Sequence, residues 1–227
     1  MSIITCCVNF SESFDGRMNS AADNVSGSCA SNEPPPNSLI FDSHRLERVF
    51  AQCFGLRFNT VLQGGYDEPV YQPPGESGEQ ALVGYRADYF ASALHEAAHW
   101  CIAGEARRRC IDYDYWYAPD GRDNKQQQAF ESAESKPQAL EWCFAIACGY
   151  YFKISPDNLD LLTGHIRDSS QFKQSIVDKA HHWKLYGLPQ RAEQYFTALA
   201  REFVITDSSG KPLSITAVEF DLGDLIG

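Results

Sequence analysis

The stretch SALHEAAHWCIAGEARR, from Ser92 to Arg108, decides the fold of this chain. It is rich in alanine, which favours the helical state. The apolar residues in and just before it recur at three- and four-residue spacing, a pattern typical of a helix with one buried face. We therefore predict a helix from about Asp88 to Arg108, whose apolar stripe consists of Phe90, Leu94, Ala97, Ala98, Cys101 and Ile102.

The middle of this predicted helix carries the motif His95-Glu96-Ala97-Ala98-His99. Two histidines four residues apart stand about 5 to 6 Å apart on one helix face, so both imidazoles can bind one metal ion. The plain alternative is a pair of ordinary surface or core histidines. Because the motif lies on a helix with a buried side and has acidic residues downstream, it predicts a metal site.

Two histidines leave a metal ion short of ligands, so a third ligand is expected from elsewhere in the fold. The other four histidines, His44, His165, His181 and His182, lie in segments with no visible relation to the motif. Four glutamates follow the motif, and their spacing does not choose between them. These candidates are Glu105, Glu131, Glu134 and Glu141.

Such a donor set serves at least two kinds of chemistry. With zinc, it polarises a bound water for hydrolysis, and Glu96 would then be the catalytic general base, as in peptidases. With ferrous iron, it leaves positions open for dioxygen and a substrate. A binding module with a structural metal is a third alternative, although structural zinc sites usually have four protein ligands rich in cysteine.

The remainder of the chain predicts further helices and few strands. Turn-forming residues cluster over residues 60–82, where we expect loops and short strands with little core. Alternating residues from Ile111 to Tyr117 suggest a strand. The predicted fold class is α+β, a helix-rich domain with a small sheet and a zincin-like HExxH helix at its centre. The other predicted helices lie at about residues 39–54, 135–151, 171–186 and 191–203.

Two of these helices have predicted boundaries with a physical reason. Asp42 or Ser43 is expected to open the first helix as its N-cap, and Gly55 to end it. Ser135 is expected to begin the second, because Pro137 is tolerated only in a first helical turn. If that helix begins earlier, the proline should kink it.

Composition bounds the domain organisation and excludes several classes of protein. The chain has 227 residues and a formal net charge of −11, which suits one domain and argues against general nucleic-acid binding. Residues 1–38 are too polar to fold and predict a disordered tail before a single domain at 39–227. No apolar run approaches the roughly 20 residues of a membrane span. The start does not resemble a secretory signal, so we expect a cytoplasmic protein with reduced thiols.

Four segments of the sequence together resemble the elongation factor P hydroxylase family. They are SALHEAAHWCIAGEARR at Ser92–Arg108, DYWYAPDGRD at Asp114–Asp123, FESAESKPQALEW at Phe130–Trp142 and DEPVY at Asp67–Tyr71. The resemblance runs in order from about residue 45 to about residue 205. Several adjacent motifs in one order are more specific than the HExxH motif alone.

The resemblance implies an iron-dependent hydroxylase that uses dioxygen to oxidise a lysine of elongation factor P after a β-lysyl group has extended that lysine. The family's two-histidine, one-carboxylate site carries over to His95, His99 and the glutamate before the KPQAL segment, Glu134. Glu131 is the neighbour to test next. Under this interpretation Glu96 need not act as a base.

Acidic residues around the second motif suit a cationic substrate. Between residues 112 and 134 they outnumber basic ones, and charge-assisted contacts would hold an ammonium group there. We take Asp120, Asp123 and Glu131 as candidate substrate-binding residues, and Arg122 as a candidate for an organic acid co-substrate if one is used. A solvated loop is the alternative.

Overall fold

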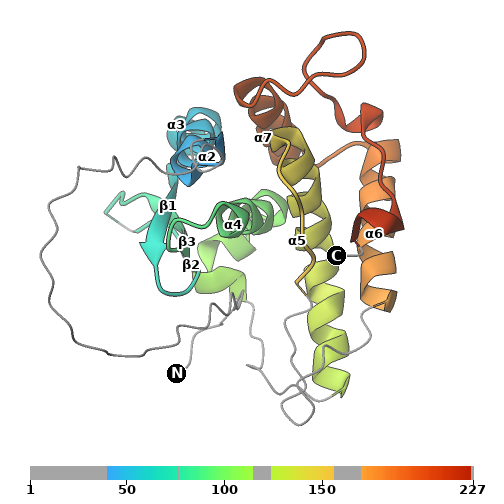
Figure 1. Ribbon diagram of the computed structural model, residues 1–227. Helices are drawn as coiled ribbons and strands as arrows, with labels where there is room; N and C mark the ends of the chain where they lie inside the picture. Colours follow the sequence, from blue (N-terminus) through green and yellow to red (C-terminus); the bar gives the residue numbers. More distant parts are fainter. Residues whose placement is uncertain (1–39, 76, 115–123, 156–169, 226–227) are drawn as a thin grey trace, which may run out of the picture.

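A three-stranded sheet and a group of helices make up the computed structural model, which describes residues 40–75, 77–114, 124–155 and 170–225 (Figure 1). The predicted tail at 1–38 lies outside these residues. The helix-rich α+β class is confirmed. The elements are α2 (Ser43–Phe50), a π-helical turn (Ala51–Gly55), α3 (Leu56–Phe58), β1 (Thr60–Tyr66), β2 (Val70–Gln72), β3 (Ala81–Arg86), α4 (Phe90–Ile102), α5 (Asn124–Cys148), α6 (Ser170–Tyr186) and α7 (Gln190–Glu202), with short 3-10 turns at Arg107–Arg109, Ile111–Asp114, Ile215–Ala217 and Leu222–Leu225.

The sheet has the strand order β1-β3-β2, with β1 parallel and β2 antiparallel to the central β3. The expectation that this region contributes little core is wrong. Within residues 60–82, Leu62, Tyr71 and Ala81 are each at most 3% exposed and belong to the core. The strand β3 reads as a nearly continuous apolar run, as a strand covered on both faces does, and α4 packs against it.

Helix α4 lies between the sheet and α5, at the centre of the fold (Figure 1). It begins at Phe90 and ends at Ile102, so the predicted end at Arg108 is wrong. The backbone turns to an extended conformation at Ala103, just before Gly104. The Arg191 guanidinium of α7 donates to the carbonyls of Cys101 (3.0 Å) and Ala103 (2.5 Å), which satisfies carbonyl groups at this helix end.

The first helix begins where the sequence indicates but continues further. Asp42 is its N-cap, and the Asp42 carboxylate accepts a hydrogen bond from the His44 amide at 3.0 Å. Gly55 does not end the helical path. The helix continues through the π-helical turn and α3 to Phe58. Asn59, in the left-handed conformation (φ 47°), ends it. The aromatic packing of Phe54 against Trp100 joins this segment to α4.

Helix α5 begins earlier than Ser135, so the predicted start of this helix is wrong. It begins at Asn124 and passes through Pro137, so the proline lies in the helix interior rather than in the first turn. Pro137 cannot donate to the carbonyl four residues earlier, but the packing of α5 against α4, α6 and α7 outweighs that loss. Gly149, with φ 66°, follows the last helical residue, Cys148. Glu131 and Glu134 therefore belong to the helix itself.

The predicted strand at Ile111–Tyr117 is also wrong in its described part. Residues Ile111–Asp114 form a short 3-10 turn in which Asp112 and Tyr113 have positive φ angles of 48° and 58°. Residues 115–117 lie outside the described residues. The two C-terminal helices, α6 and α7, are confirmed to within one residue at each end.

The buried side chains of the described residues form one hydrophobic cluster that includes α2, the sheet and α4 to α7. Cys101, Cys143 and Cys148 are free thiols buried within it. Among the described residues, no helix has the length and apolar character that crossing a membrane requires.

Candidate metal centre

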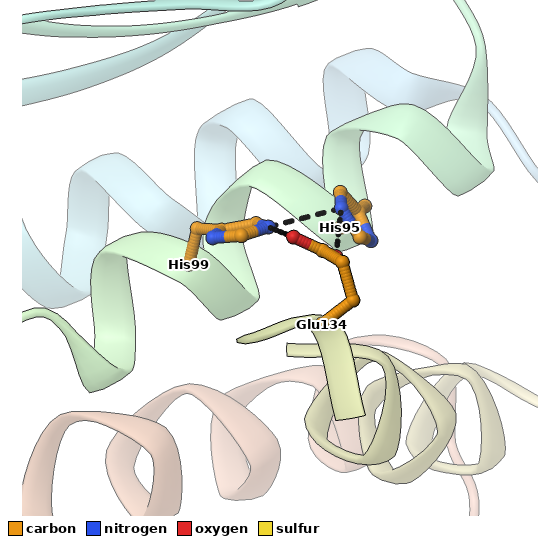
Figure 2. Close-up of side chains that lie close together, drawn as sticks. All are labelled: His95, His99 and Glu134. Carbon is orange, nitrogen blue, oxygen red and sulfur yellow. Dashed lines mark hydrogen bonds and ion pairs between the residues drawn. The ribbon is translucent and has the colours of Figure 1, made fainter. Parts of the chain in front are cut away.

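Two imidazoles from α4 meet at the face that this helix turns toward α5 (Figure 2). His95 and His99 are one helical turn apart, and both are 8% exposed. Their Nε2 atoms lie 3.0 Å apart and their rings meet edge to face. Two ring nitrogens that converge in this way can bind one cation.

A carboxylate from α5 completes the group. Glu134 is fully buried and points toward the two imidazoles (Figure 2). The Glu134 oxygens lie 3.5 Å from His95 Nε2 and 3.5 Å from His99 Nε2. One donor atom from each of the three residues can be chosen so that all lie within 4.8 Å of one another. Two imidazole nitrogens and one carboxylate oxygen suit a divalent ion such as Fe(II) or Zn(II), so the donor set fits a metal.

Glu141 orients His95. The Glu141 Oε2 atom lies 2.8 Å from His95 Nδ1, in a buried ion-pair geometry. A carboxylate at this place favours the tautomer in which Nδ1 carries the proton, which leaves the lone pair of His95 Nε2 facing His99 and Glu134. Burial raises the pKa of Glu141, and the hydrogen bond with His95 opposes that rise.

Glu96 and Tyr113 lie beside the two imidazoles. Glu96 is 8% exposed; burial raises its pKa, the charges of His99 and His95 lower it, and those of Glu134 and Glu141 add to the rise. The Tyr113 ring is parallel to that of His99, with 6.4 Å between the centroids. Burial, and then the charge of Glu96, raise the pKa of Tyr113.

The other sequence candidates lie elsewhere. Glu105 is exposed on the loop after α4 and pairs with Arg109. Glu131 is on α5 but is not among the residues whose donor atoms meet, and its Oε1 atom accepts a hydrogen bond from Gln127 at 2.9 Å. The structure thus brings Glu134, and neither of these two, to the histidines. The candidate substrate-binding residues Asp120, Arg122 and Asp123 lie outside the described residues.

Sequence reasoning missed the orienting role of Glu141, which it considered only as a third ligand, and the place of Tyr113 beside His99. A signal for the first was present. Glu134 and Glu141 are seven residues apart, and residues seven apart lie two turns apart on nearly the same face of a helix. No comparable signal exists for Tyr113, because its position depends on an irregular turn with positive φ angles.

Comparisons with known proteins bear on this centre. A family model described as elongation factor P hydroxylase matches residues 49–211, a range that includes His95, His99, Glu134 and Glu141. An elongation factor P lysine hydroxylase from Haemophilus influenzae is 41% identical over 167 residues, which cover 72% of this chain and 92% of the relative. Neither match is a peptidase, so the zinc hydrolase alternative is not supported.

Proposed function

Since this chain belongs to the elongation factor P hydroxylase family, we propose that it hydroxylates a lysine side chain of elongation factor P at the centre of His95, His99 and Glu134. One observation carries the proposal: three buried donors meet in a chain that the family model matches over residues 49–211. The resemblance of the sequence motifs implies that the substrate lysine first carries a β-lysyl group.

The proposed metal is Fe(II) and the proposed co-substrate is dioxygen, which makes the enzyme a non-haem Fe(II) monooxygenase. His95, His99 and Glu134 would hold the ion. A bound ferrous ion with these three ligands supplies the activation of dioxygen that oxidation of an unactivated C–H bond requires. Monooxygenation also consumes two electrons, which a reductant or an organic co-substrate supplies.

Residues of the chain itself orient the proposed ligands and keep bulk water out of the site. Glu141 fixes the His95 ring through Nδ1, so that Nε2 is available without reorganisation. Nearly all of α4 is buried, which keeps bulk water from the two imidazoles. Glu96 remains the candidate for a catalytic contact, because it is a buried carboxyl group, other than the proposed ligand Glu134, whose pKa both histidines affect.

Substrate approach is proposed to use acidic residues near the second motif. Glu131 is partly exposed on α5, one turn before Glu134, and so lies on the approach to the centre. Asp120 and Asp123 would add negative charge for an incoming lysine, and Arg122 would suit an organic acid. Charge complementarity of this kind raises the rate of capture.

We further propose that residues 39–227 act as one hydroxylase domain. The chain works in the cytoplasm, where its protein partner is elongation factor P, and it has no direct contact with nucleic acid or membrane. The position of the HExxH helix between a small sheet and a second helix supports a zincin-like arrangement.

The test is the mass of elongation factor P after incubation with the chain, Fe(II), a reductant and air. The expected result is a gain of one oxygen atom on the β-lysylated protein. Omission of iron, or addition of a chelator, should abolish the gain. An unchanged mass with iron-loaded chain would refute the function.

A further inference from the structure

Two arginines approach each other at the C-terminal end of α4. Arg191 Nη2 of α7 donates to the Ala103 carbonyl at 2.5 Å, and Arg108 Nη1 donates to the same oxygen at 2.7 Å. Both guanidinium groups also lie over the Trp100 ring, at 5.0 Å and 5.8 Å from its centroid. Burial, and then the charge of Arg108, lower the pKa of Arg191. Two cations this close repel each other, so a negative charge beside them would stabilise the pair.

No carboxylate of the described residues supplies that charge. Neither Arg108 nor Arg191 forms an ion pair with them, whereas the neighbouring Arg109 pairs with Glu105. No aspartate or glutamate is among the groups that most affect the pKa of Arg191. The chain has a formal net charge of −11, so acidic side chains are plentiful and still do not lie here.

Helix capping accounts for only part of this arrangement. The hydrogen bonds to the carbonyls at the end of α4 use Nη2 of Arg191 and Nη1 of Arg108. A guanidinium group carries five N–H donors, so other donors remain on each side chain. Arg191 Nε is buried and forms no hydrogen bond with the described residues. Both side chains are partly exposed, so a small ligand from solution can reach them.

The indole N–H of Trp100 is a second buried donor without a partner. Trp100 is 0% exposed, and its Nε1 atom forms no hydrogen bond with the described residues. Burial raises the pKa of Tyr71, and Arg108, the Trp100 indole and Arg191 oppose that rise, so all three lie near the Tyr71 hydroxyl. That hydroxyl donates to the Arg108 carbonyl at 2.8 Å. Buried donors without partners are rare in a packed core and indicate an acceptor from outside the chain.

We infer that Arg108, Arg191 and Trp100 form a binding site for a small oxyanion, the carboxylate or phosphate group of a ligand from solution. Guanidinium and indole groups offer N–H donors and no acceptor, whereas the oxygens of such an anion accept hydrogen bonds and carry the missing charge. Guanidinium groups match carboxylate and phosphate in geometry as well as in charge. The C-terminal end of α4 carries only a partial negative charge, which two full positive charges outweigh.

This oxyanion site lies one helical turn beyond the metal centre. The Ala103 amide donates to the His99 carbonyl at 3.0 Å. Tyr71 stacks on Tyr113 at 4.1 Å between ring centroids, and the Tyr113 ring is parallel to that of His99. None of the three residues of the oxyanion site belongs to the group of metal donors. The inference therefore does not depend on the proposed function, and its test requires no elongation factor P.

The test is calorimetric titration of the full chain with inorganic phosphate and, separately, with succinate, at an ionic strength held constant with sodium chloride. At least one of the two anions should bind at one saturable site per chain. Arg108→Met and Arg191→Met should each weaken that binding about 10- to 100-fold, the worth of a charge-assisted hydrogen bond. Arg109→Met is the matched control and should leave affinity unchanged, because Arg109 lies in the same turn and pairs with Glu105. Binding of phosphate alone would indicate a phosphate ligand, and binding of succinate alone an organic acid.

Three results would overturn the inference. The first is that neither anion binds more tightly than chloride. The second is unchanged affinity in both Arg108→Met and Arg191→Met, which would place the anion elsewhere, the metal centre included. The third is an equal loss in Arg109→Met, which would reduce the effect to net charge. Arg191 also anchors the end of α4, so Arg108→Met alone decides the matter if Arg191→Met does not fold.

Discussion

Removal of the Glu141 carboxylate should weaken metal binding although Glu141 is not among the three proposed ligands. The Glu141 Oε2 atom lies 2.8 Å from His95 Nδ1, and the two side chains are 11% and 10% exposed. At this burial, a hydrogen bond to a charged group is worth about 1.5 to 3 kcal/mol. Since about 1.4 kcal/mol corresponds to a tenfold change, Glu141→Ala should weaken metal affinity about 10- to 100-fold.

Competition with a chelator of known affinity measures this effect under anaerobic conditions. Glu141→Gln should lose less than Glu141→Ala, because an amide oxygen can still accept from His95 Nδ1 but carries no charge. Glu131→Gln is the matched control, since Glu131 lies on the same helix and contacts Gln127 instead. Unaltered affinity in Glu141→Ala, or an equal loss in Glu131→Gln, would refute the orienting role.

Three substitutions test the packing around the centre by urea unfolding. Gly84→Ala should destabilise the chain by about 1 to 3 kcal/mol, because the new Cβ would lie 2.7 Å from Val70 Cγ1; an unchanged midpoint would contradict the strand pairing. Arg191→Met should cost about 2 kcal/mol through lost hydrogen bonds to the end of α4, and a neutral effect would exclude that anchoring. Tyr113→Phe should cost nothing, because its hydroxyl has no partner among the described residues, whereas Tyr71→Phe should cost about 1 kcal/mol. Equal losses in the two tyrosine variants would argue against an unpaired Tyr113 hydroxyl.

Local sequence signals predicted the helix that carries the histidines. Alanine content and apolar spacing act within a few turns, and the positions of His95 and His99 follow from helix geometry alone. The end of that helix was misjudged, because it depends on Ala103 and on the distant Arg191. Such contacts between α4 and α7 leave no trace in a short window of sequence.

The third metal ligand, Glu134, could not be identified from sequence spacing alone. Spacing left four glutamates open, and only the family resemblance singled out Glu134. Its meeting with the histidines depends on how α5 packs against α4, and that packing also carries the helix through Pro137. The predicted strand at Ile111–Tyr117 failed for a related reason. The short pattern of alternating residues that suggested a strand carries no information about the positive φ angles of Asp112 and Tyr113.

The most direct test of the central claim compares Glu134→Ala with Glu131→Ala, in iron content and in hydroxylation of elongation factor P. The two residues lie one turn apart on α5, but only Glu134 approaches both histidines. We predict that Glu134→Ala neither retains iron nor adds oxygen to the substrate, while Glu131→Ala retains one iron per chain and measurable turnover. Full iron content and turnover in Glu134→Ala would contradict the proposed centre.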